Sequence, residues 1–247
     1  MKIASNKQAR MNSSRLPGKV LMKINGKPII SFLTDRLKRL KKIDQIIIAT
    51  TKNKKDNQIV SFCEKNELDC YRGSEKNVLK RIFDAAKFFK ADIILFITGD
   101  CPLIDTDIIE KQLNYFIKNK KKLDYLGNSF IRSYPVGMDF QIFNFKTLKK
   151  NFEISKKKLE QEHVTLGIKR NPELFRVKNL VAPKNLFWPE LGLTLDEIED
   201  FILIKKIILY FKKNNKDYFD CRSIINLLQR KNNWIKINSH IVRKGDT

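Results

Sequence analysis

The stretch DIILFITGD, residues 92–100, is a short run of β-branched and other apolar residues that ends in Gly-Asp. A second run of this kind, QIIIATT, occupies residues 45–51. Continuous apolar runs of this length are typical of strands that are buried on both faces of a sheet. The two runs therefore predict strands in the interior of a parallel sheet.

The sequence between these two strands predicts a helix. Within residues 74–89, apolar side chains recur at steps of four, three and four residues, and Ser74 is placed to cap the N-terminus. Strand and helix alternate in this way along the first half of the chain, which implies a parallel sheet covered by helices on both faces. The predicted fold class is α/β.

The domain organisation follows from chain length and element order. The 247 residues suffice for one large domain, and no repeat or linker divides them, so we expect a single domain over residues 1–247. Two strand-like segments without a helix between them predict a small mixed-sheet excursion at about 124–150. Residues 222–247 are expected to form a tail, a short helix and then an extended arm, in which Trp234 and Ile237 need a packing partner.

The composition narrows the classes of partner. The net charge of +23 invites a nucleic-acid role, but the lysines lie in short runs such as KNKKK at 118–122, without interleaved aromatic residues. A solvated basic surface is the simpler interpretation, and we predict no nucleic-acid partner. The sequence has no apolar run long enough to span a bilayer and no secretion signal, so we expect a soluble, cytoplasmic protein with four reduced cysteines.

The loop QARMNSSRLPGK, residues 8–19, follows the first candidate strand and precedes an amphipathic helix. It is expected at the carboxyl edge of the sheet, where open α/β folds bind ligands. Arg10, Arg15 and Lys19 would surround that edge with positive charge, and Gly18 would let the backbone approach an anion closely. The loop has no Walker A or GxGxxG spacing. Taken alone, it is either an anion-binding loop or a solvated turn.

Two carboxylates also follow apolar runs. Asp100 ends the stretch quoted first, and Asp196 ends an expected strand in LTLDEIED, residues 193–200. Two carboxylates that face a basic loop form the arrangement needed by Mg²⁺ and a nucleoside triphosphate. An alternative for Asp196 is a plain N-cap that forms a capping box with Glu199, and Asp105 is expected to cap the helix at 106–116.

Six motifs along the chain occur in an order that resembles one enzyme family. They are QARMNSSRLPGK (8–19), YRGSEKNVLKR (71–81), ITGDCPLID (97–105), YPVGMDFQIF (134–143), EQEHVT (160–165) and LTLDEIEDF (193–201). This series is similar to that of the SpsF-type cytidylyltransferases, which are related to the enzymes that make CMP-3-deoxy-manno-octulosonate and CMP-acylneuraminate. The resemblance extends from Gln8 to the INSHI of the tail and covers nearly the whole chain.

The resemblance implies a Rossmann-like nucleotidyltransferase fold and an enzyme that transfers CMP from CTP to a small acidic acceptor. The acceptor would be an acidic sugar or a related compound, used in surface polysaccharide synthesis. The resemblance also implies release of pyrophosphate, Mg²⁺ as cofactor and a homodimer, with the 124–150 segment near the acceptor site or the dimer contact.

The same comparison implies roles for individual residues. Catalysis would depend on Arg10, Lys19 and Asp100, and the metal would be held by Asp100 and Asp196. The nucleotide-binding set is Ala9, Arg10, Met11, Arg15, Gly18, Lys19, Arg72, Ser74 and Asn77. The acceptor pocket would include Asp139, Glu162 and His163.

The chain departs from the family pattern in two places. Ser5, Asn6 and Lys7 stand where an apolar strand is usual, and these polar residues would cost stability or distort the strand. Gln161 stands where an arginine is common, and the proline often found after HVT is absent, which bears on acceptor preference. The alternatives are therefore a catalytically weakened nucleotide-binding homologue, a glycosyltransferase of related fold, or a basic nucleic-acid binder.

Overall fold

A seven-stranded sheet forms the centre of the computed structural model, which describes residues 1–243. Its strands, in spatial order, are β5 (Asp69–Gly73), β4 (Gln45–Thr51), β1 (Ile3–Gln8), β6 (Ile93–Thr98), β8 (Gln141–Asn144), β7 (Tyr125–Gly127) and β9 (Val177–Asn179). The two apolar runs predicted as interior strands are β4 and β6, and both pair in parallel with β1 between them. The α/β prediction is confirmed.

The segment at 124–150 extends this sheet. β8 runs antiparallel to both β6 and β7, whereas β7 and β9 are parallel to each other. Mixed pairing is thus present as predicted, but these strands belong to the main sheet and not to a separate excursion from it. The sheet is mostly parallel, with β8 as its reversed strand.

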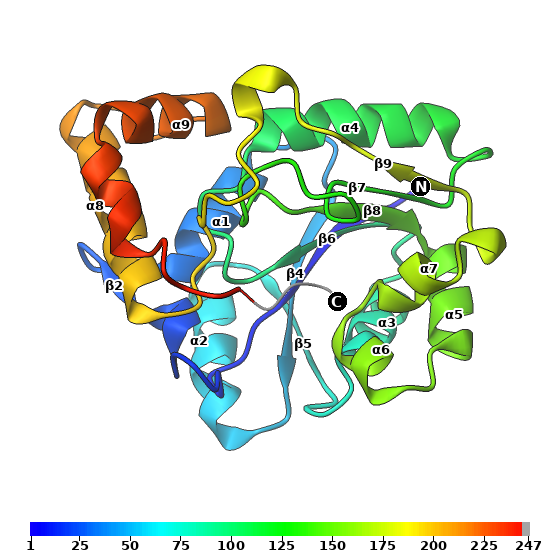
Figure 1. Ribbon diagram of the computed structural model, residues 1–247. Helices are drawn as coiled ribbons and strands as arrows, with labels where there is room; N and C mark the ends of the chain where they lie inside the picture. Colours follow the sequence, from blue (N-terminus) through cyan, green and yellow to red (C-terminus); the bar gives the residue numbers. More distant parts are fainter. Residues whose placement is uncertain (244–247) are drawn as a thin grey trace.

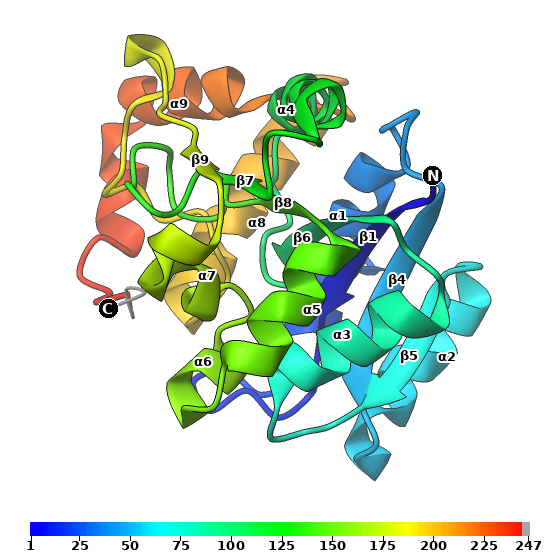
Figure 2. The same ribbon diagram turned by 90° about the vertical axis from the view of Figure 1, so that its right-hand side faces the viewer.

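Helices cover both faces of the sheet (Figure 2). One face carries α1 (Ile29–Leu37), α2 (Asn57–Lys65) and α4 (Thr106–Asn119), whose apolar side chains pack on β1, β4 and β6. The other face carries α3 (Val78–Phe88) and α5 (Phe145–Ile154), which lie side by side. This is the layered arrangement that alternating strands and helices predict.

Residues 198–237 form a further helical group beside the sheet (Figure 1). α8 (Ile198–Lys213), α9 (Cys221–Arg230) and the 3₁₀ helix η5 (Asn232–Ile237) share one apolar cluster. The arm expected to be extended is therefore helical over residues 232–237. Trp234 meets Tyr210 of α8 edge-on at 6.3 Å between ring centroids, which supplies the packing partner that the tail needs.

Short elements make up the rest. They are β2 (Lys23–Ile24), β3 (Lys27–Pro28), α6 (Lys158–Glu162), α7 (Leu166–Arg170), η1 (Lys19–Leu21), η2 (Lys54–Asp56), η3 (Pro172–Leu174) and η4 (Lys184–Leu186). β2 and β3 form a separate two-stranded antiparallel sheet.

Two of the predicted helix caps can be compared with the structure. Asp105 caps α4, because its side chain accepts hydrogen bonds from the amides of Asp107 and Ile108 at 2.9 and 3.1 Å. The prediction that Ser74 caps α3 was wrong. Asn77 is the cap and accepts from the Lys80 amide at 2.7 Å, whereas Ser74 accepts from the Asn77 amide at 3.0 Å. Ser74 shapes the turn before the helix.

The polar residues of the first strand lie at the centre of the molecule. Ser5, Asn6 and Lys7 are fully buried, yet β1 pairs with both neighbours along its length, so the strand is not distorted. The Lys7 amino group donates to Ser5 Oγ at 2.7 Å, and Asn6 Nδ2 donates to the Ile82 carbonyl at 3.3 Å. Burial holds the pKa of Lys7 well below its ordinary value.

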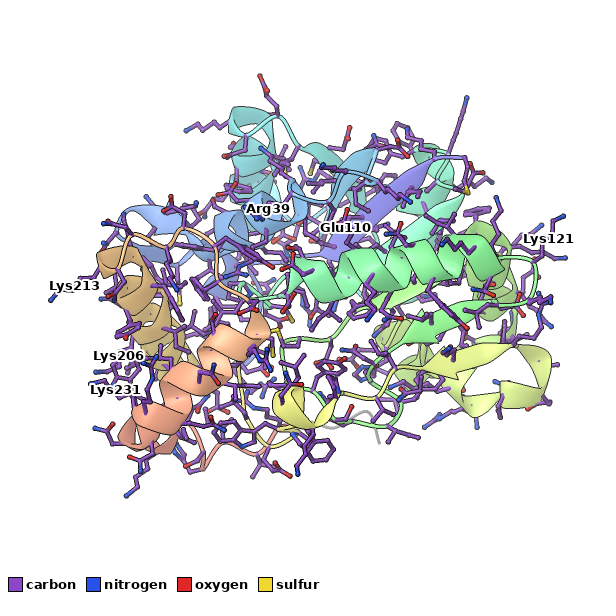
Figure 3. All side chains as sticks on the ribbon, turned by 90° about the horizontal axis from the view of Figure 1, so that it is seen from above. Arg39, Glu110, Lys121, Lys206, Lys213 and Lys231 are labelled. Carbon is purple, nitrogen blue, oxygen red and sulfur yellow. The ribbon has the colours of Figure 1, made fainter. Side chains whose placement is uncertain are left out.

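The surface lysines are distributed over distant elements. In Figure 3, Lys121 projects from one end of the molecule, and Lys206, Lys213 and Lys231 project from α8, α9 and their ends at the opposite side. These four side chains do not converge on one groove. Within residues 1–243, no helix combines the length and apolar character needed to cross a bilayer.

Candidate active site

A cleft of about 610 Å³ opens at the carboxyl ends of β1 and β6. Most of the residues predicted for the site line it, and they come from several loops. These residues are Ala9, Arg10, Arg15, Lys19, Asp100, Asp139, Glu162, His163 and Asp196. The sheet thus brings together residues that lie far apart in the sequence, at the edge where ligands bind in open α/β folds.

The loop after β1 is closed by its own backbone. The Gly18 amide donates to the Met11 carbonyl at 2.9 Å, and Gly18 has a φ of 72°, a left-handed conformation that favours glycine. The Met11 amide donates to Asp56 Oδ1 at 2.7 Å. Met11 and Gly18 therefore shape the loop without lining the cleft. Arg10 lines the cleft and is exposed.

Lys19 lies where the two predicted metal-binding carboxylates meet. Its ammonium group is 2.7 Å from Asp100 Oδ2 and 3.0 Å from Asp196 Oδ1, and it donates to the Leu195 carbonyl at 2.6 Å. Burial disfavours the charge on Lys19, but Asp100 and Asp196 outweigh burial and raise its pKa. Burial likewise opposes the Asp100 charge, and Lys19 overcomes it to lower that pKa. Lys19 and Asp100 are therefore both charged at neutral pH.

The segment before Asp196 is held by backbone hydrogen bonds and is not the expected sheet strand. The Leu193 amide donates to the Val136 carbonyl at 2.7 Å, and the Leu195 amide donates to the Asp100 carbonyl at 2.9 Å. The second bond fixes the two carboxylate-bearing loops against each other. Asp100 and Asp196 therefore have a common support.

Asp196 does not cap the following helix. α8 begins at Ile198 with Glu197 as its N-cap, and the capping box uses Asp200, so the predicted pairing of Asp196 with Glu199 was wrong by one residue. The Asp196 carboxylate faces the cleft, where the Arg15 guanidinium lies 2.7 Å away. Three positive side chains surround it: Lys19, Arg15 and, at 3.8 Å, Arg243.

The donor set of the site fits Mg²⁺. Within residues 1–243, no group of three or more His, Cys, Asp or Glu side chains is arranged to hold a metal ion. Asp100 and Asp196, however, both contact the single Lys19 ammonium, so their oxygens converge within reach of one cation. Mg²⁺ is commonly held by one or two carboxylates, with water and substrate phosphates completing its shell.

The residues expected near the base and ribose have structural contacts instead. Arg72 donates to the carbonyls of Thr51 and Asn53 at 3.0 and 2.9 Å, which ties β5 to the loop after β4. Ser74 and Asn77 form the turn and cap at the start of α3. None of these three residues lines the cleft, so their predicted contact with a nucleotide stays a prediction.

The opposite wall of the cleft carries the predicted acceptor residues. Asp139 accepts from Arg132 Nη1 at 3.1 Å and from the Gly137 amide at 3.1 Å, so its orientation is fixed. Glu162 ends α6 and His163 follows it as the C-cap. Gln141, at the start of β8, lies on the same wall. Both signs of charge are present here, in contrast to the basic loop.

Three cleft residues that sequence reasoning missed have buried polar atoms without a hydrogen-bond partner in the described part of the chain. These atoms are Gln8 Oε1, Arg81 Nε and Ser129 Oγ. Arg81 is 1% exposed, and burial lowers its pKa to about 10, with Arg10 as a further cause. Buried polar groups are normally satisfied, so these three atoms stand out among the residues that line the cleft. Two of these residues could have been found from their positions in the sequence, because Gln8 ends the first strand and Arg81 ends the second motif.

A smaller cavity of about 320 Å³ lies between α1 and α8. Aromatic residues and the cations Arg36 and Arg39 line it, but it contains none of the residues predicted for the site. The chemistry-bearing residues thus point to the larger cleft.

Comparison with known proteins identifies one family. A family model for cytidylyltransferases matches residues 8–224. The spore coat polysaccharide biosynthesis protein SpsF of Bacillus subtilis is 32% identical over 231 residues, which cover 90% of this chain and 92% of that protein. The structure of a cytidylyltransferase from Leptospira borgpetersenii superposes with a TM-score of 0.90 at 31% identity and 99% coverage of both chains.

A shorter match reaches a sugar-acid enzyme. The 3-deoxy-manno-octulosonate cytidylyltransferase of Pelobacter propionicus is 33% identical over 116 residues, 46% of this chain and 44% of that enzyme. The similarity therefore covers less than half of either protein.

Proposed function

This chain belongs to the cytidylyltransferase family as an SpsF-type member, and from that premise we propose that it transfers CMP from CTP to an acidic sugar. The acceptor would be of the nonulosonate or octulosonate type, and the product would serve surface polysaccharide synthesis. The observation that carries the proposal is the convergence of Lys19 with Asp100 and Asp196 in a cleft bordered by Arg10 and Arg15.

The reaction is an in-line displacement at the α-phosphorus of CTP. An acceptor oxygen forms a new bond to that phosphorus while the bond to the bridging oxygen of pyrophosphate breaks. A bound Mg²⁺, held by Asp100 and Asp196, would supply charge that polarises the phosphate. Arg10, Arg15 and Lys19 stabilise the negative charge that develops on the departing pyrophosphate.

Lys19 has a second role before substrate binds. Its charge neutralises the two carboxylates, which would otherwise repel each other in a partly buried site. When the phosphates bind, the same ammonium can turn from the carboxylates towards the phosphates. In the absence of nucleotide, Lys19 thereby keeps the two carboxylates close together.

The acceptor wall favours an acidic sugar. Arg132 pairs with Asp139 while about a third of its side chain remains exposed, which leaves donors for a sugar carboxylate. An attacking sugar hydroxyl must also lose its proton, and His163 on the same wall is the candidate base. An acceptor that is already anionic at its attacking oxygen would need no such base.

A pyrophosphate-release assay tests the proposal. We expect release from CTP and Mg²⁺ with at least one acceptor among nonulosonates, octulosonates and aminoalkylphosphonates. Asp100→Asn should reduce the rate by about 10³-fold or more, because it removes a charged group that acts on the transition state. Asp217→Asn is the matched control, since this exposed carboxylate lies outside the cleft and should leave the rate unchanged.

The other outcomes separate the remaining functions. CTP binding without pyrophosphate release in any arm would indicate a catalytically weakened homologue. Turnover of preformed nucleotide sugars would indicate a glycosyltransferase. We also expect a cytoplasmic homodimer, which light scattering of the purified protein and cell fractionation would test.

A further inference from the structure

The Asp200 carboxylate joins the C-terminal tail to the loop that carries Asp196. Its Oδ2 accepts from the backbone amides of Asp196 and Glu197 at 2.9 and 3.0 Å. Its Oδ1 accepts from Asn238 Nδ2 and Arg243 Nη2, both at 2.7 Å. The Asp200 side chain is completely buried, so these donors are its available partners in place of water.

The tail segment is fitted to this position. Asn238 Nδ2 also donates to the Gly192 carbonyl at 3.0 Å, and the Arg243 side chain is only 15% exposed. A Cβ added at Gly192 would overlap the Arg243 guanidinium, so the glycine leaves the room that this arginine occupies. In Figure 1 the red segment that follows η5 runs from the α8 and α9 side toward the sheet.

The same segment borders the candidate active site. Asn238, Ser239, Ile241 and Arg243 line the cleft together with Lys19 and Asp100. Arg243 Nη1 lies 3.8 Å from Asp196 Oδ2, so the arginine is next to the carboxylate whose backbone Asp200 holds. Tail and cleft are therefore in direct contact through residues of opposite charge.

We propose that Arg243 and Asn238 are positioning residues: by holding Asp200, they fix the backbone at Asp196 and orient its carboxylate toward the cleft. A buried carboxylate that loses its cationic partner is strongly destabilised as an anion. Without Arg243, the Asp200 carboxylate loses a charged donor that holds it in place, and its movement releases the amides of Asp196 and Glu197. The metal-related part of this inference rests on the proposed function, whereas the structural coupling does not.

Hydrogen exchange tests the coupling without substrate or metal. In Arg243→Ala, the amides of Asp196 and Glu197 should exchange about tenfold faster or more, because their charged acceptor is weakened. Lys236→Ala, which removes an exposed cation from the same tail, should leave both amides unchanged. Wild-type exchange at both amides in Arg243→Ala would overturn the proposal.

Gly192→Ala displaces the arginine without removing it. We expect exchange at Asp196 and Glu197 to rise as in Arg243→Ala, because the new methyl group occupies the guanidinium position. When Gly192→Ala is combined with Arg243→Ala, it should add little to the exchange rate, since the guanidinium that it displaces is already gone. Fully additive effects of the two substitutions would contradict the proposal.

Metal dependence extends the test to function. Arg243→Ala should raise the Mg²⁺ concentration for half-maximal pyrophosphate release by about 10- to 100-fold, the usual effect of losing an outer partner of a ligand. Arg243→Lys should recover part of this, and KM for CTP should change less. Unchanged Mg²⁺ dependence in Arg243→Ala would refute the coupling to the metal. Absence of turnover in the wild-type protein would refute the proposed function instead and leave the exchange result to decide the coupling.

Discussion

Lys7 and Lys19 are both removed from solvent, but their environments differ in the partners that each offers. Lys7 lies near the C-terminal end of β1, is completely buried and donates to the neutral Ser5 hydroxyl. Lys19 lies at the edge of the sheet between two carboxylates. The pKa falls at the first site and rises at the second. The depth of burial therefore does not decide whether a lysine stays charged; the neighbouring charges do.

The largest effect is expected from removing the charged lysine, Lys19. Lys19→Met should reduce pyrophosphate release by about 10²- to 10³-fold, because it removes an electrostatic contact to the developing charge. Lys23→Met, at an exposed position nearby, is the control and should keep the wild-type rate. A Lys19→Met enzyme as active as the control would show that Lys19 serves the fold alone.

Removing the neutral lysine, Lys7, should make the protein more stable. Lys7→Met should raise the free energy of unfolding at pH 7 by about 1–3 kcal/mol, because a buried amine is replaced by an apolar chain of similar length. Ser5 Oγ keeps the Leu95 carbonyl as an acceptor at 3.4 Å. Urea unfolding measures the difference. A destabilised variant would mean that the amine contributes more to β1 than its burial costs.

The pH dependence of stability should separate the two lysines. The folded pKa of Lys7 is lowered, so between that value and about 10.4 the unfolded chain binds a proton that the folded chain lacks. Stability in the wild-type protein therefore rises with pH relative to Lys7→Met, by at most about 1.4 kcal/mol per pH unit. Parallel stability curves for the two proteins from pH 7 to 10 would contradict a neutral Lys7.

Lys19 has the reverse dependence. Its pKa is raised, so its contribution is complete below the ordinary lysine value and is lost only as the pH rises through the raised value. Unfolding of wild type and Lys19→Met should accordingly differ by a constant amount across neutral pH.

The smallest effect is expected at the hydroxyl that Lys7 contacts. Ser5→Ala should lower the free energy of unfolding by about 1 kcal/mol, the usual value of one buried hydrogen bond. In the Lys7→Met background the same substitution should cost less, since the amine is gone. Equal costs in both backgrounds would show that the bond between the two side chains contributes nothing.

The parts of the fold with strong local patterns could be predicted from the sequence. β4 and β6 are apolar runs, and α3 repeats its apolar residues at helical spacing, so burial on the expected faces followed directly. The cap of α3 and the capping box of α8 were each misplaced, because several neighbouring polar residues could serve and local geometry selects among them.

The candidate site was predictable only as a location. Lys19, Asp100 and Asp196 were expected at one edge, but their direct pairing depends on how separate loops are held, as by the bond from Leu195 to Asp100. Arg243 gave no signal in the sequence, since its position depends on the packing of η5 against α8. Contacts between residues this distant in the chain come from tertiary structure and not from periodicity.

The reversed direction of β8 has a consequence for how the two sides of the cleft can change. The parallel strands β1 and β6 reach the cleft at their ends, so the side that carries Lys19 and Asp100 is built from loops that leave the sheet. β8 starts at that edge, so Asp139 and Gln141 arrive on a segment that enters the sheet. The two sides thus belong to separate connections. A change of length or composition before β8 would alter the side that carries Asp139 and Gln141 while the side that carries Lys19 and Asp100 stays intact.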